Sequence, residues 1–233
     1  TIAHRFVPGS DSTPLQIPID NGGSAAVTRS GIVYWSKGSL WSIPKTGGKA
    51  RRLADVGHQP QFLMAAGEDI AWLDMPVRDQ FLIQTLDGRR TRTLLSYAGR
   101  IETATMDAGR VWFVRRDGAT AWTIGSVSLR GGKATYAAPK SGPHPAKLAV
   151  AGDVYYYDVG SNEVRRLSSD LSKEATLTHD FSCSPIAVSV RIYCPNMDGM
   201  FELARHAGAK LMPLFPSTAR ITSVAASSRF LVW

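Results

Sequence analysis

The chain has 233 residues, of which 44% are hydrophobic, and its formal net charge is +8 at pH 7. No apolar run approaches the roughly 18 residues of a transmembrane helix, which excludes a helical membrane span. No linker or low-complexity tract divides the sequence, so it predicts one domain over 1–233, as is common for all-β chains of this length.

The segment Ile32–Leu53, IVYWSKGSLWSIPKTGGKARRL, predicts two strands and the start of a third. Residues 32–35 and 40–43 are rich in the β-branched and aromatic side chains that favour strands. Pro44 ends the second strand because it has no N–H to donate. The glycines within 46–48 allow a second tight turn.

This pattern recurs along the whole chain, with one aromatic or bulky marker residue in each second strand. The markers, 37 to 43 residues apart, are Trp35, Trp72, Phe113, Tyr156, Cys194 and Trp233. A strand is predicted before each marker, over 25–29, 62–66, 101–106, 146–151, 185–190 and 221–226. Four antiparallel strands at a period of about 40 residues are typical of a propeller blade. The alternative is a β-sandwich in which the spacing is coincidental.

The two ends of the chain complement each other. Trp233 is the last residue, so the sixth blade lacks its third and fourth strands. Residues 4–8 and 15–17 resemble those missing strands. The sequence therefore predicts an all-β, six-bladed β-propeller with four antiparallel strands per blade, the last blade being built from about 1–20 and 219–233. Such closure removes the open strand edge of a linear array.

Two cysteines, Cys183 and Cys194, fall on consecutive strands of one predicted hairpin. This arrangement predicts a disulfide and an extracytoplasmic location, whether secreted, periplasmic or surface-attached. A turn at 190–191 would place Cys194 opposite Ala187, too far from Cys183 for a bridge. The disulfide therefore requires a turn nearer 188–189 or a loop that folds back, and two buried thiols are the alternative.

Much of the positive charge lies in arginine pairs. These are Arg51-Arg52, Arg89-Arg90, Arg115-Arg116 and Arg165-Arg166. One interpretation is that charge on exposed strand edges prevents pairing between molecules. The other is attraction to an anionic polymer at the cell surface. Nucleic acid is not expected, because no nucleic-acid recognition motif accompanies the charge.

The stretch Val33-Tyr34-Trp35 followed by Leu40–Gly48 resembles the YWTD-type six-bladed propellers and, more broadly, the TolB-like repeats of secreted bacterial proteins. The aspartate of the YWTD motif is matched here only by Asp74 and Asp158. The resemblance implies the fold. Propellers of this kind are mostly binding platforms, although lactonases and lyases share similar scaffolds, so fold analogy alone does not choose a function.

In a propeller, ligand sites gather where loops from several blades converge at the mouth of the central channel. The ligand-binding candidates expected on that face are Lys37, Asp74, Met75, Arg78, Glu102, Arg115, Arg116, His144, Asp158 and Asn196. The segment 74–79 is expected to be a long loop between second and third strands. Its apolar centre, with basic neighbours, would suit an acidic partner.

Three histidines, His58, His144 and His179, precede predicted first strands of the second, fourth and fifth blades, near that face. With Glu102 they are candidate ligands of a divalent metal that could activate water. The alternative is that their ring nitrogens bond nearby carbonyl groups. No catalytic motif is present, and no cofactor is expected.

The sequence thus favours a non-enzymatic binding or scaffold module for a protein partner or an extracellular, anionic polymer. The first alternative is a metal-assisted lyase or hydrolase at the mouth of the channel, and the second is a purely structural subunit.

Overall fold

The computed structural model describes most of the chain between residues 24 and 179 and a series of strands outside that range. The described ranges are 24–78, 80–88, 90–107 and 109–179, with Cys183, Pro185 and strand segments near both ends. The chain divides into two compact units, unit 1 with residues 1–98 and 128–132, and unit 2 with residues 99–127 and 133–233. The single domain expected over 1–233 stays a prediction.

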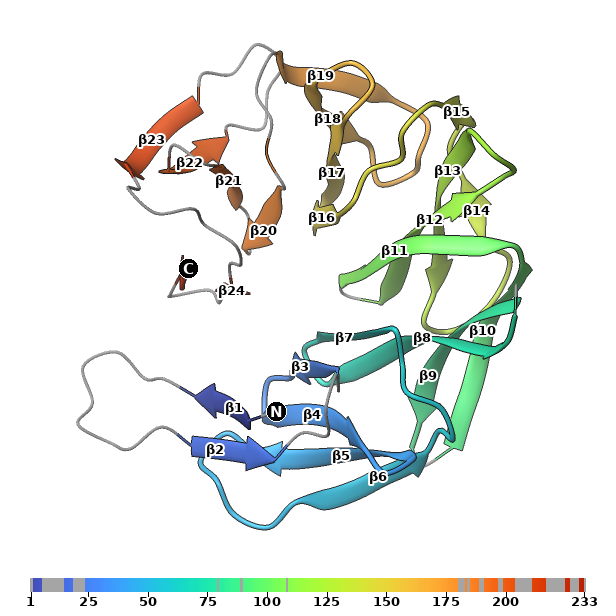
Figure 1. Cartoon of the computed structure of the whole chain (residues 1–233), viewed down its shortest axis with the longest axis vertical. Coiled ribbons are helices and arrows are strands. Elements are labelled where there is room, and N and C mark those ends of the chain that lie inside the picture. Colours follow the sequence, from blue (N-terminus) through green and yellow to red (C-terminus); the bar gives the residue numbers. More distant parts are fainter. Residues whose placement is uncertain are drawn as a thin grey trace. The chain divides into compact units, whose positions relative to one another are not determined.

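Unit 1 contains two four-stranded antiparallel sheets and one two-stranded sheet (Figure 1). The first sheet consists of β3 (Ala25–Val27), β4 (Gly31–Ser36), β5 (Ser39–Pro44) and β6 (Arg51–Asp55). The second consists of β7 (Phe62–Ala66), β8 (Asp69–Val77), β9 (Gln80–Asp87) and β10 (Arg90–Ala98). The two-stranded sheet pairs β1 (Ile2–Arg5) with β2 (Leu15–Pro18). Strands β3 and β7 contact each other, so the first strands of successive sheets are neighbours.

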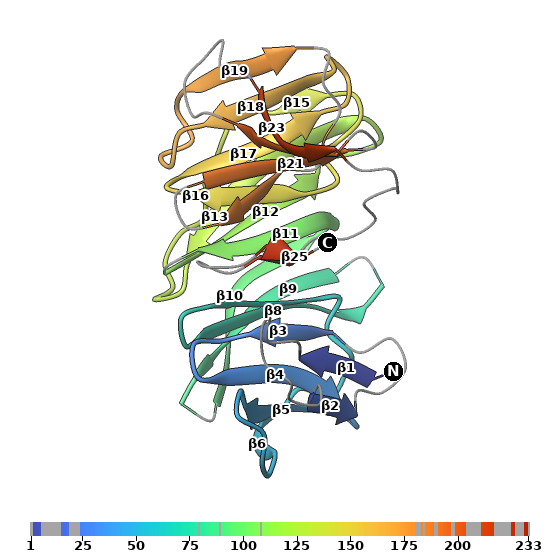
Figure 2. The ribbon, with the colours of Figure 1, turned by 90° about the vertical axis from the view of Figure 1, so that its left-hand side faces the viewer.

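Unit 2 also consists of antiparallel sheets, drawn from green to red in Figure 2. Its first sheet has β11 (Arg100–Asp107), β12 (Arg110–Arg116) and β13 (Ala121–Ser128), with both β14 (Thr135–Tyr136) and β15 (Lys140–Ser141) paired to β13. The next sheet has β16 (Leu148–Ala151), β17 (Asp153–Asp158), β18 (Glu163–Leu167) and β19 (Glu174–His179). The last four-stranded sheet has β20 (Ile186–Val188), β21 (Arg191–Asn196), β22 (Gly199–Leu203) and β23 (Leu211–Pro216). A final pair joins β24 (Ala225–Ala226) to β25 (Leu231–Val232).

The predicted all-β architecture with repeated antiparallel sheets is confirmed. In the described part of the chain every element is a strand, and no helix could span a membrane. The pairs β1–β2 and β24–β25 form separate two-stranded sheets. Six blades, and a sixth blade closed by both termini, therefore stay predictions.

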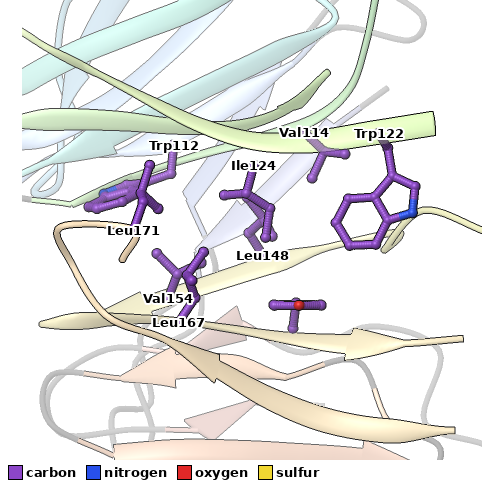
Figure 3. Packing of buried hydrophobic residues seen from close by; sticks show 9 residues of the cluster. Trp112, Val114, Trp122, Ile124, Leu148, Val154, Leu167 and Leu171 are labelled. Atoms are coloured by element: carbon purple, nitrogen blue, oxygen red, sulfur yellow. The ribbon is translucent and has the colours of Figure 1, made fainter. Parts of the chain in front are cut away.

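Buried side chains of the second strands pack against two different neighbours. On β17, Tyr156 joins a core shared with β12 and β13, whereas Tyr155 joins a core that includes Ile192. Figure 3 shows the first of these cores, with Trp112, Trp122, Leu148 and Val154 among its members. Successive side chains of a strand point to opposite faces of the sheet. A strand enclosed on both faces is therefore apolar at almost every position, which explains the continuous runs at the markers.

The predicted disulfide is confirmed, since Cys183 and Cys194 are bonded with their Cα atoms 5.3 Å apart. Strand β20 pairs Val188 with Arg191, a register between the two considered from the sequence, and residues 189–190 lie outside the described ranges. Both sulfur atoms lie in the buried core beside Ile192.

Candidate functional site

The segment expected to be a long loop is the extended end of a hairpin, and that expectation is wrong. Strand β8 runs to Val77, which pairs with Gln80 on β9. The ladder shifts register between Asp74 and Val77. Pro76 lies within this irregularity, where no ladder hydrogen bond is required of its nitrogen. The connection to β9 is therefore a tight turn at residues 78–79, of which Asp79 lies outside the described residues.

Asp74 is a buried carboxyl group whose hydrogen bonding is incomplete. The residue is only 5% exposed, and its Oδ1 atom is buried without a hydrogen-bond partner among the residues that the structure describes. Burial raises the pKa of Asp74, while a hydrogen bond from the Met75 backbone and the nearby His58 partly oppose that rise. An unpaired buried polar atom is costly. Carboxyl groups with perturbed pKa values concentrate at binding and catalytic sites.

Exposed apolar side chains follow Asp74 on the last residues of β8. Met75 is 42% exposed and Val77 is 57% exposed. Gln61 approaches the same place, with its Nε2 atom 3.7 Å from the Met75 Sδ atom. We call Asp74, Met75 and Val77, with His58 and Gln61, the β8 end. It offers an apolar contact and one unsatisfied acceptor.

A second group of predicted residues meets at the start of β11. Arg100 pairs directly with Arg116 on β12, and Glu102 lies where the ladder shifts register. The Glu102 Oε2 atom is 3.1 Å from Arg100 Nε and 3.6 Å from His144 Nε2. The Glu102 Oε1 atom is 3.5 Å from Arg116 Nη1. We call these four residues the Glu102 cluster.

The structure thus brings together Glu102, Arg116 and His144, which the sequence placed near one another, and adds Arg100, which it missed. A hint of Arg100 was present, because strand residues two apart share a face. Sequence reasoning did not place Arg100 opposite Arg116, which depends on the register of β11 and β12.

Two cations expected to attract an acidic partner are held within their own sheet. Arg115 lies 2.9 Å from Asp117 Oδ1, and its guanidinium is 4.1 Å from the centre of the Tyr136 ring. Arg116 donates from Nη2 to the Ala119 carbonyl over 2.7 Å, in addition to its contact with Glu102. These contacts give both arginines a role in the sheet itself.

The other candidates are dispersed. Lys37 lies in the turn between β4 and β5 with a positive φ of 48°, and Arg78 lies exposed in the turn after β8. Asn196 ends β21, and its side chain lies outside the described residues.

Asp158, the second match to the repeat aspartate, has its own partners. Its Oδ2 atom is 3.1 Å from Arg165 Nε and 3.9 Å from Lys140 Nζ, and its Oδ1 atom accepts from the Gly160 N–H over 3.1 Å. Arg165 also contacts Glu174 and Glu163. Asp158 is therefore part of an internal ion-pair network.

Each candidate metal-binding histidine lies beside a different carboxyl group. His58 neighbours Asp74, His144 faces Glu102, and the exposed His179 places Nδ1 2.8 Å from Glu163 Oε1. His144 Nδ1 also lies 3.3 Å from the Pro145 carbonyl oxygen. Over the described ranges, no group of three or more His, Cys, Asp or Glu residues is arranged to hold a metal ion.

No protein-family model and no curated protein sequence matches the chain. Solved structures do match at the level of fold. Nidogen, from a nidogen/laminin complex, has a TM-score of 0.58 at 15% identity, over 84% of this chain and 83% of that one. A gluconolactonase from Xanthomonas campestris has a TM-score of 0.58 at 13% identity, over 88% of this chain and 79% of that one.

TolB from Acinetobacter baumannii has a TM-score of 0.53 at 12% identity over 80% of this chain, which spans 50% of the TolB chain. At these identities the likeness shows the fold alone. The chain resembles, in its fold, the β-propellers of the YWTD and TolB-like type.

Proposed function

We propose that the chain is a non-enzymatic binding module that holds a protein partner at the β8 end. The observation that carries this proposal is the buried Asp74 Oδ1 atom, which has no hydrogen-bond partner within the described ranges and is followed on β8 by the exposed Met75 and Val77. A partner that supplies one donor and a small apolar surface would satisfy the carboxyl group and cover both side chains.

The energetics support this role. Leaving a buried acceptor unsatisfied costs about 1–3 kcal/mol, and a bound partner that donates to it recovers that cost. Methionine and aromatic side chains are enriched at protein interfaces, and contacts from which water is excluded carry most of the binding energy. Among proteins of similar fold, nidogen was solved in a complex with laminin, which is compatible with a binding role for this scaffold.

The chemistry of the β8 end favours a particular kind of partner. An unsatisfied carboxyl group selects a hydroxyl, ammonium or guanidinium donor. The partner group is therefore basic or hydroxyl-bearing, rather than acidic as the arginine pairs had indicated. An anionic extracellular polymer is the competing occupant.

The test compares immobilised full-length proteins exposed to extracellular material from the native source. A double variant, Met75→Asp with Val77→Asp, is expected to retain at least tenfold less of the partner than the unmodified chain, because two carboxylates would have to be buried. Val159→Asp, a matched change at an exposed valine of unit 2, is expected to bind normally. Equal retention by all three proteins would show that the partner does not bind at the β8 end. Retention that survives protease treatment of the extracellular material, but not glycosidase treatment, would identify the partner as a polymer.

A second candidate function is a metal-assisted hydrolase or lyase. The observation that favours it is the raised pKa of Asp74 beside His58, since such a pair suits general acid–base chemistry. A gluconolactonase shares the fold. Hydrolysis of sugar lactones, with and without added divalent metal, tests this candidate. Activity abolished in both Asp74→Asn and His58→Ala would establish the enzyme, and the absence of turnover with or without metal would reject it.

The proposal includes the closure of a sixth blade by the two ends of the chain and an extracytoplasmic location. We infer that β1, β2, β24 and β25 complete a sixth blade, which the matching strand pairs at the two ends of the chain support. Deletion of residues 1–20 is then expected to lower the melting temperature by about 10 °C or more, in proportion to the lost strands. An unchanged melting temperature would reject closure.

The Cys183–Cys194 disulfide supports an extracytoplasmic location, which cell fractionation would test.

A further inference from the structure

A cavity of about 240 Å³ in unit 1 is lined by residues of both four-stranded sheets. Its apolar lining belongs to the core shared by the two sheets and consists of Val33, Leu53, Ile70 and Leu86. Its polar lining includes Ser30, Ser42, Arg51, Glu68 and Asp69. A cavity of about 150 Å³ holds benzene, so this one has room for a six-membered ring that carries polar substituents.

The register of the first sheet directs Arg51 into this cavity. Arg51 on β6 pairs with Ser42 on β5, and residues directly opposite each other in a ladder project to the same face. Ser42 lies two residues from Leu40, which is buried in the core shared by the two sheets, and residues two apart on a strand also share a face. The next residue, Arg52, is instead paired with Asp55 of its own strand. The two members of this arginine pair therefore have different roles.

Several polar groups of the cavity have no partner within the protein. Over the ranges that the structure describes, the side chains of Ser42, Arg51 and Asp69 form no hydrogen bond or ion pair. Glu68 accepts one hydrogen bond, which the Ser30 hydroxyl donates to its Oε2 atom over 2.7 Å. The cavity therefore offers a guanidinium donor, two carboxylates with unused acceptor capacity and a hydroxyl group, next to an apolar surface.

The equivalent carboxylate of unit 2 provides the contrast. Asp153 is the first residue of β17, as Asp69 is the first residue of β8. Asp153 Oδ1 accepts from the Ser169 N–H over 3.1 Å, and its Oδ2 atom is 3.8 Å from Arg166 Nε. The position is thus occupied by internal contacts in unit 2, whereas the carboxylate of Asp69 is left to a ligand.

We propose that this cavity binds a neutral, hydroxyl-rich ligand of the sugar class. A hydroxyl group both donates and accepts, so neighbouring hydroxyls of one ring can donate to Glu68 and Asp69 and accept from Arg51. The C–H groups of the ring would cover the apolar lining. An anion is disfavoured because two carboxylates accompany the single guanidinium, and a cation is disfavoured because Arg51 repels it.

The cavity and the β8 end lie at opposite ends of one strand. A strand rises about 3.3 Å per residue, so Asp69 and Val77 are separated by roughly 25 Å. The sugar site therefore adds to the proposed partner site and does not depend on it.

The experiment titrates the full chain with glucose, galactose and mannose in turn and follows the backbone amide signals by NMR. The proposal predicts saturable shifts at Ser30, Asp69 and Gly88, which line the cavity, for at least one of these sugars. The uronate and the 2-amino derivative of that sugar, which carry opposite charges on the same ring, are expected to bind more weakly. Saturation by none of the three sugars, or tighter binding of either charged derivative, would overturn the proposal.

Two variants assign the site. Arg51→Gln and Asp69→Asn change exposed side chains, so both proteins are expected to fold and to bind the sugar about tenfold more weakly, the order of one charge-assisted hydrogen bond. Arg52→Gln removes the same charge from the adjacent residue and is expected to leave the affinity within about twofold. Equal losses in Arg51→Gln and Arg52→Gln would show a general effect of charge and would contradict the assignment to this cavity.

Discussion

Two carboxyl groups of this protein are equally hidden from water but differ in their partners. Asp74 in unit 1 and Glu102 in unit 2 are both almost fully buried. Glu102 meets two arginines and a histidine of its own chain. Asp74 retains a buried oxygen without a partner in the described part of the chain, and burial raises its pKa. The partners of Glu102 lie within the chain, and the different state of Asp74 is the basis of the proposal that its partner comes from outside.

Asp74 and Asp158 occupy equivalent positions of the repeat but have different partners. Asp74 pairs with Leu82 on β9, and Asp158 pairs with Glu163 on β18. Two residues further along the third strand, unit 2 has Arg165, which contacts Asp158. Unit 1 has Gln84 at that position, and its Oε1 atom accepts from Trp72 Nε1 over 2.9 Å. The third strand thus supplies a cation to the repeat aspartate in unit 2 and a neutral amide, bonded to Trp72, in unit 1.

The largest effect is expected for Glu102→Gln. The neutral amide cannot offset the repulsion between Arg100 and Arg116, so the free energy of unfolding is expected to fall by about 2 kcal/mol. This is less than the roughly 3–5 kcal/mol for a fully buried pair, because the arginine heads are exposed. Urea unfolding measures the loss, with Glu68→Gln at an exposed carboxylate as the matched control. A loss no larger than that of the control would mean that the Glu102 contacts contribute little.

Asp74→Asn is expected to act in the opposite direction, raising the free energy of unfolding at pH 7 by about 1 kcal/mol, the order of one unsatisfied buried group. A folded-state pKa above the ordinary value of 3.8 means that the folded protein binds this proton more tightly than the unfolded chain. The ionised group therefore destabilises the fold as the pH rises from 3.8 through the folded-state pKa. The gain of the variant is expected to vanish below pH 3.8.

Asp158→Asn is the control for the direction of the stability change expected for Asp74→Asn. It removes a contact with Arg165 and is expected to lower stability at pH 7. Destabilisation by both asparagine variants would erase the distinction between the two repeat aspartates.

The smallest effect is expected for His144→Gln. The histidine is half-buried, and its contact with Glu102 is long, at 3.6 Å. The change in the free energy of unfolding is expected to stay below about 0.5 kcal/mol, as for a partly exposed charge contact. Thermal unfolding of His144→Gln and of Glu102→Gln, measured side by side, compares the losses of stability in the two variants. Similar losses would make His144, rather than the arginines, the main support of Glu102.

The sequence predicted the sheets well because their period is carried by buried side chains. Trp72 and Tyr156 mark second strands whose two faces are both enclosed, and such runs are visible without a structure. The extension of β8 was missed because Met75-Pro76 reads as a loop, whereas the irregularity in the ladder accommodates the proline.

The contacts of the candidate sites were less accessible. The pairing of Arg115 with Asp117 and Tyr136, and of Arg100 with Glu102, depends on register and on strands distant in the sequence. The sequence therefore named Glu102, Arg116 and His144 as candidates on one face, but it gave neither the contacts among them nor the place of Arg100.

The most direct test of the central claim is the titration of the Asp74 carboxyl group, followed by the NMR signal of its ¹³Cγ atom in the unmodified chain. Because the carboxyl group is buried with one oxygen unpaired, the midpoint is expected to lie above the ordinary value of 3.8. Addition of the partner is expected to lower that midpoint, since a donor stabilises the ionised form. A midpoint at or below 3.8 in the free protein would show that the Asp74 carboxyl group already has hydrogen-bond donors within the chain. That result would contradict the proposal that an outside partner binds at the β8 end.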